Sequence, residues 1–101
     1  MEIVSNKVNL DKSVAGVYVC DLLSWVMSNA NENDLWITVL TNINVVAVAM
    51  LTDVACVVIP ESIEIESETI TKAENEGVTI LRSDMSAYEI CIRAHELLRE
   101  F

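Results

Sequence analysis

Hydrophobic and polar residues follow one another along the chain in blocks that predict alternating strands and helices. Four short runs rich in β-branched residues predict strands, and they span residues 13–20, 35–40, 55–59 and 79–81. Segments with helical spacing or capping residues follow them, over residues 21–30, 44–51, 67–76 and 86–101. This alternation predicts an α/β fold: a three-layer α/β/α sandwich around a mainly parallel sheet of about four strands.

Three of the predicted helix boundaries rest on capping residues. Asp21 is expected to cap the first helix through its carboxylate. Gly77 stands where a left-handed C-terminal cap belongs. Ser86 and Glu89 have the spacing of a capping box at the start of the last helix. With 101 residues, the chain is expected to form a single domain, residues 1–101.

The segment 44–51, NVVAVAML, is apolar on every side of a helix. A helix of this kind must be covered all round, and one sheet covers only one side. We therefore predict that this helix forms a two-fold interface in a homodimer. The predicted interface residues are Val45, Val46, Val48, Ala49 and Met50. The alternative is central burial of the helix beneath its neighbours.

The charge balance limits the classes of partner. Sixteen acidic and six basic residues give a formal net charge of −10, which disfavours nucleic acid and anionic membranes. Six glutamates lie within residues 61–76, where they form either a solvated face or a docking surface for a basic partner. The first ten residues have polar breaks where a signal peptide carries its apolar region, so a cytoplasmic location is expected.

The carboxyl ends of the strands are the expected place for a ligand in an open α/β sheet. The candidate ligand-binding residues there are Asp21, Thr41, Asn42, Asn44, Ser83 and Asp84. The group Thr41, Asn42 and Asn44, at a predicted helix N-terminus, is the corner best suited to an anion. Carboxylates at this edge could chelate Mg²⁺, but such residues are common caps and turn formers. We predict no metal and no cofactor.

No catalytic constellation stands out in the sequence. Gly16 lacks the neighbouring glycines of a phosphate-binding loop, which favours a bulge or a close backbone approach in the strand. His95 is the only histidine and is expected at the boundary of the last helix, without a nucleophile to pair with. The chain is therefore predicted not to be an enzyme.

The cysteines and tryptophans are expected to serve packing. Cys20, Cys56 and Cys91 form no CxxC motif and lie in apolar segments, which is typical of buried structural thiols. Trp25 and Trp36 are expected in the core or at its edge, since a platform for bases would have basic neighbours.

The chain resembles the DRTGG domain family, which is named for an Asp-Arg-x-x-Thr-Gly-Gly-like signature near its first strand. Asp11 and Gly16 match this signature, while Lys12, Ala15 and Val17 replace its Arg, Thr and second Gly. The resemblance is stronger downstream, in the W-I-T of the second strand, Asn44, the V-A-V-A helix and the apolar third strand. It extends from about Leu10 to Leu98.

This resemblance implies a three-layer α/β/α fold, similar to the N-terminal domain of HPr kinase/phosphorylase. It also implies an accessory, regulatory or dimer-forming role. Our leading hypothesis is a non-catalytic regulatory or scaffolding module that acts through homodimerisation and through contact with a protein partner or a small ligand. The alternative is a nucleotide- or metabolite-sensing domain that binds its ligand at the carboxyl ends of the strands.

Overall fold

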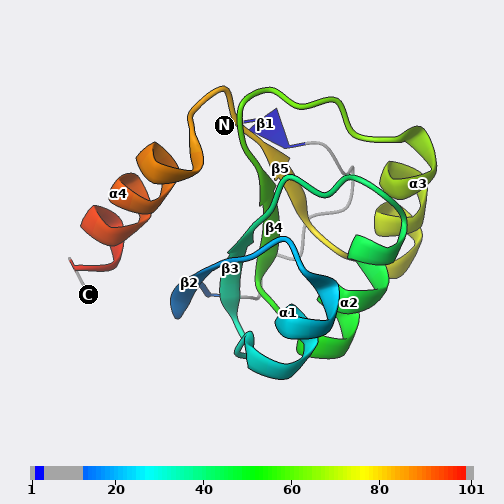
Figure 1. Ribbon diagram of the computed structural model, residues 1–101, viewed down its shortest axis with the longest axis horizontal. Helices are drawn as coiled ribbons and strands as arrows, with labels where there is room; N and C mark the ends of the chain where they lie inside the picture. Colours follow the sequence, from blue (N-terminus) through cyan, green and yellow to red (C-terminus); the bar gives the residue numbers. More distant parts are fainter. Residues whose placement is uncertain (1, 4–12, 100–101) are drawn as a thin grey trace.

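The computed structural model describes residues 2–3 and 13–99, and it contains a five-stranded sheet with helices on both faces (Figure 1). The strands are β1 (Glu2–Ile3), β2 (Gly16–Val19), β3 (Asp34–Ile37), β4 (Cys56–Ile59) and β5 (Ile80–Arg82). The helices are α1 (Leu23–Asn29), α2 (Asn44–Thr52), α3 (Ser67–Glu76) and α4 (Ala87–Leu98). No helix within the described ranges is long and apolar enough to cross a membrane.

The sheet has the order β1-β5-β4-β3-β2. Strands β2 to β5 are parallel, and β1 pairs antiparallel with β5. Because consecutive parallel strands are neighbours and such crossovers are right-handed, the three connecting helices lie on one face. Figure 1 shows α1, α2 and α3 on one side of the sheet and α4 on the other. The predicted α/β/α sandwich is therefore confirmed, with outer layers of unequal size.

Two hydrophobic clusters fill the spaces between these layers. The larger one lies on the face of α1, α2 and α3, and it includes Trp36, Val46 and Ile80. The smaller one lies on the face of α4 and is centred on Ile37, Val58 and Ile90. Residues of β3 alternate between the two clusters, since successive side chains of a strand point to opposite faces. The apolar character of β3 and β4 thus reflects helices on both sides.

Two predicted helix boundaries are confirmed. Gly77 ends α3 in the left-handed conformation, with φ 72°. The capping box of α4 is complete: the Glu89 backbone N–H donates to Ser86 Oγ at 3.2 Å, and the Ser86 backbone N–H donates to Glu89 Oε1 at 3.3 Å. Strand β1 was not predicted, because two residues are too few to show the alternation of hydrophobic and polar positions that marks a strand.

The predicted role of Asp21 as a helix cap is wrong. Leu22 is the N-cap residue of α1, and its side chain makes no capping hydrogen bond. The Asp21 Oδ1 atom instead accepts hydrogen bonds from Thr38 Oγ1 at 2.8 Å and from the Val39 backbone N–H at 2.9 Å. The parallel pairing of β2 with β3 brings these two strand ends together, so the carboxylate connects neighbouring strands.

The predicted interface on α2 is wrong for four of its five residues. Val45, Val46, Val48 and Ala49 are buried within their own protomer and offer no surface to a second copy. The reason is topological: α2 is the middle helix of its layer, in contact with both α1 and α3. Central burial, the alternative considered above, explains the apolar pattern. Only the outer side of α2, which includes Met50 and Leu51, is exposed.

Candidate functional site

The predicted ligand residues near the start of α2 hold the chain in place. The Thr41 carbonyl accepts a hydrogen bond from Thr69 Oγ1 of α3 at 2.7 Å. Asn42 Oδ1 accepts from the Asn44 backbone N–H at 3.0 Å, and the Asn44 side chain is exposed. These two hydrogen bonds join the loop before α2 to α3 and shape that loop.

Ser83 and Asp84, at the end of β5, differ in their exposure. Ser83 is buried, and its Oγ atom accepts from the Met85 backbone N–H at 3.0 Å. The Ser83 carbonyl also accepts from the Ser62 backbone N–H at 2.8 Å. Asp84 is exposed. The structure thus places the six candidate residues around one edge of the sheet, where Asp21, Asn42 and Ser83 each use a side-chain oxygen in a separate structural contact.

A hollow of about 630 Å³ lies near the carboxyl ends of β4 and β5. It is lined by Glu64, Ile65, Glu66, Ser67, Ile70 and Arg82. Arg82 and the N-terminus of α3 provide positive potential here, whereas Glu64 and Glu66 oppose it. In the part of the chain that the structure describes, this hollow lies where a ligand at the strand ends is expected.

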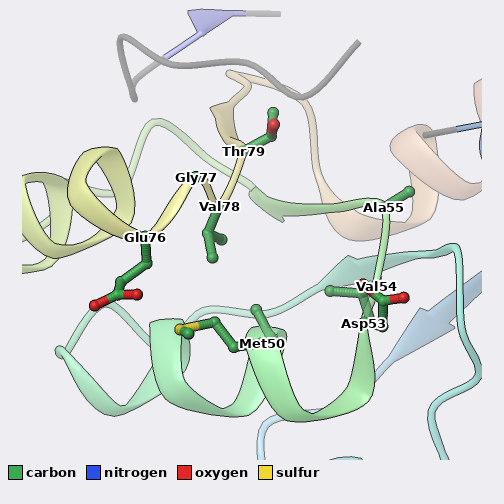
Figure 2. Close-up of a pocket in the computed structure, with 9 residues that line it drawn as sticks. Met50, Asp53, Val54, Ala55, Glu76, Gly77, Val78 and Thr79 are labelled. Carbon is green, nitrogen blue, oxygen red and sulfur yellow. The ribbon is translucent and has the colours of Figure 1, made fainter. Parts of the chain in front are cut away.

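A second pocket, of about 250 Å³, lies at the opposite, amino ends of β4 and β5 (Figure 2). Its wall includes the ends of α2 and α3, where Asp53 and Gly77 adopt left-handed conformations. Asp53 and Glu76 contribute carboxylates, and helix C-termini carry partial negative charge. The pocket is therefore unsuited to a phosphate.

Large apolar side chains are exposed where β2 passes into α1. Val19, Leu22 and Trp25 are 52%, 62% and 57% exposed, respectively. We call strand β2 together with these three residues the β2–α1 edge. Trp25 departs from the expected packing role, whereas Trp36 is fully buried and donates its Nε1–H to the Cys20 carbonyl at 2.9 Å. Spacing alone does not separate the two tryptophans, because exposure depends on which side of α1 faces the sheet.

Gly16 marks a close approach between β2 and β3, as predicted. A Cβ atom at this position would lie 2.9 Å from Asp34 Oδ1. The Asp34 carboxylate is buried, and its Oδ2 atom accepts from the Asn31 backbone N–H at 2.8 Å. Gly16 therefore leaves room for a structural carboxylate.

The three cysteines are free thiols with different surroundings. Cys56 is buried in β4, and burial raises its pKa from 9.0 to about 11. Cys20 and Cys91 are half-buried. Because a thiol reacts through its thiolate, Cys56 is suited to packing rather than to nucleophilic chemistry.

Residues that could hold a metal do not gather in the described part of the chain. Within residues 13–99 there is no group of three His, Cys, Asp or Glu side chains placed to bind an ion. His95 lies exposed on α4.

Comparison of the chain with protein-family models, curated proteins and solved structures finds no match. The resemblance to the DRTGG family therefore stays a prediction from the quoted residues, and function must be argued from the molecule itself.

Proposed function

We propose that the chain is a non-catalytic regulatory or scaffolding module of the cytoplasm that acts as a homodimer. The β2–α1 edge carries this proposal. It combines three exposed apolar side chains: Val19 in β2, the outermost strand of the described sheet, and Leu22 and Trp25 at the start of α1. Exposed apolar side chains gathered at one edge are typical of interaction sites, and tryptophan is enriched among the residues that dominate binding energy.

The use of polar groups supports a role without catalysis. The carboxylate of Asp21 and the hydroxyl of Ser83 already accept hydrogen bonds from neighbouring parts of the chain. A general base or nucleophile must reach its substrate, and the burial of Ser83 opposes this. Three free thiols, one of them buried, fit a reducing compartment.

Light scattering coupled to size-exclusion chromatography tests this proposal. We expect the wild-type protein, at about 50 µM, to have twice the chain mass of 11.2 kDa and to dissociate on dilution. A mass of 11.2 kDa at every concentration up to about 500 µM would contradict a homodimer, since association of that weakness has little regulatory use.

The second candidate is a metabolite-sensing domain, and the hollow beside Arg82 favours it. Its position at the carboxyl ends of β4 and β5 agrees with where ligands bind in open α/β sheets. A thermal-shift screen against nucleotides and sugar phosphates tests this candidate. Stabilisation that is lost in Arg82→Gln would support it, and unchanged melting temperatures across the screen would reject it.

A further inference from the structure

We propose that two copies of this chain join through the outer edges of their β2 strands, which pair antiparallel about a two-fold axis. The two sheets would thereby form one continuous sheet. This inference rests on the proposed homodimer and adds its geometry. It arises from the strand order, the distribution of charge and the side chains that flank β2.

The first observation is that the two edges of the sheet differ. At one edge, the short antiparallel strand β1 covers β5. At the other edge, β2 is the outermost strand, and among the described residues only β3 pairs with it. Proteins commonly protect such an edge with charged residues, proline or bulges. Residues 13–20, SVAGVYVC, contain neither charge nor proline, so β2 has neither of these two protections against pairing.

The second observation concerns the direction of the β2 backbone. The Cys20 backbone N–H donates to the Ile37 carbonyl at 3.3 Å at the end of the β2–β3 ladder. Alternate residues of a parallel strand bond to the same neighbour, so the N–H and C=O groups of Val17 and Val19 face the outer edge. Antiparallel pairing centred on Tyr18 would join Val17 of each copy to Val19 of the other, and both residues would exchange their hydrogen bonds.

The third observation is the distribution of charge. Asp21 is the only charged residue within residues 13–31, whereas residues 61–76 hold six glutamates and one lysine. These acidic residues belong to α3 and the loop before it, which connect β4 to β5, away from β2. Two copies that meet at β2 therefore keep their acidic parts far apart. This matters for a chain with a net charge of −10.

The uncharged edge also argues for a second copy over a charged partner. A basic protein would gain most from the acidic α3 region, and an acidic one would find no cations in residues 13–31. A two-fold axis makes the edge self-complementary, because antiparallel strands present the same groups to each other. The pairing also places the two Asp21 carboxylates at opposite ends of the shared ladder.

The flanking side chains would add apolar contacts to the backbone pairing. Leu22, the N-cap residue, and Trp25 of α1 are exposed directly after β2 in the chain, and Val19 is exposed within the strand. On the other face, α4 packs against β2. Packing on both faces of β2 within each copy keeps the strand extended. The edge is therefore preorganised for pairing.

Amide hydrogen exchange followed by NMR tests this geometry in the wild-type protein. We expect the amides of Val17 and Val19 to exchange at least about tenfold more slowly at dimer-forming concentrations than in dilute, monomeric protein. A dimer whose Val17 and Val19 amides exchange equally fast at both concentrations would overturn the edge pairing but not the proposed function. A strict monomer would overturn both.

A proline variant provides the second test. Val19→Pro removes an N–H that faces outward and leaves the bonds to β3 in place. Val19→Thr keeps this N–H and is the matched control. We expect Val19→Pro to weaken dimerisation at least about tenfold and Val19→Thr to dimerise. A Val19→Pro protein with unaltered dimer affinity would contradict the proposal. Should Val19→Pro fail to fold, the exchange measurement decides.

Discussion

At the residue scale, the polar side chains at the strand ends connect elements to one another. Asp21 joins β2 to the segment after β3, and Ser83 holds the turn before α4. The residue types expected of a ligand site were present at the expected edge. The sequence could not show that oxygen atoms of Asp21 and Ser83 accept hydrogen bonds within the fold, because the three-dimensional arrangement of the strand ends determines which donors reach them. Gly16 was easier to interpret, since an isolated glycine in a strand has few roles.

Removal of the Asp21 carboxylate is expected to destabilise the fold. Asp21→Ala deletes the acceptor for Thr38 and Val39, and we expect a loss of about 1–3 kcal/mol in the free energy of unfolding. Asp21→Asn keeps one oxygen and should lose less. Urea denaturation measures the free energy of unfolding of both variants. Equal stability of the wild type and Asp21→Ala would show that these hydrogen bonds contribute nothing.

Burial of Cys56 is expected to make stability fall at alkaline pH. Its pKa is raised from 9.0 to about 11 in the folded protein, so the unfolded state loses this proton first as the pH rises. The unfolded state is then favoured between these two values, and the contribution reaches about 2 kcal/mol at pH 11. Well below pH 9 the thiol is protonated in both states, and this destabilisation is absent.

The comparison with Cys56→Ala isolates this contribution from other groups that titrate at high pH. Denaturation at several pH values should show a steeper decline above pH 9 for the wild type than for the variant. Parallel curves for the two proteins would contradict a raised pKa.

At the scale of elements, the sequence was a good guide to the order and type of strands and helices. The spacing of hydrophobic residues and the capping residues predicted β2 to β5 and all four helices to within a few residues of their observed bounds. The environment of α2 was harder to predict. Its composition showed that it must be covered, but the number of neighbouring helices follows from the strand order, which local patterns do not encode.

Two substitutions on α2 should separate its buried and exposed sides. Val46 is fully buried, and we expect Val46→Ala to lower the free energy of unfolding by about 2 kcal/mol. Leu51 is 72% exposed, so Leu51→Ala should change the free energy of unfolding by less than about 0.5 kcal/mol. Thermal or chemical denaturation provides the measurement. Similar losses in both variants would show that α2 is covered on its outer side too.

At the scale of the whole molecule, charge and apolar surface lie at different places. The glutamates follow β4 and continue along α3, while the β2–α1 edge is nearly uncharged and apolar. This arrangement allows association at one edge despite a net charge of −10. The sequence showed the excess of apolar helical residues and predicted an interface on α2. It could not indicate β2, where we propose the interface, because the exposure of β2 depends on its position at the end of the sheet.

Long-range repulsion between the acidic parts should make the proposed dimer sensitive to salt. Added salt screens charges that lie more than about 10 Å apart, whereas apolar contacts and strand pairing persist. We therefore expect dimer affinity to increase several-fold between about 20 mM and about 300 mM NaCl. Affinity that falls with added salt would indicate an interface held by ion pairs instead.

Sedimentation equilibrium of two matched leucine variants tests the central claim most directly. Leu22 and Leu51 are both largely exposed, but only Leu22 belongs to the β2–α1 edge. We predict that Leu22→Lys weakens the dimer by at least about tenfold, because each copy would then bring a charged side chain into an apolar contact that pairing desolvates. Leu51→Lys should sediment as the wild type does. Loss of the dimer in Leu51→Lys, with Leu22→Lys unaffected, would place the interface on α2 and contradict the account.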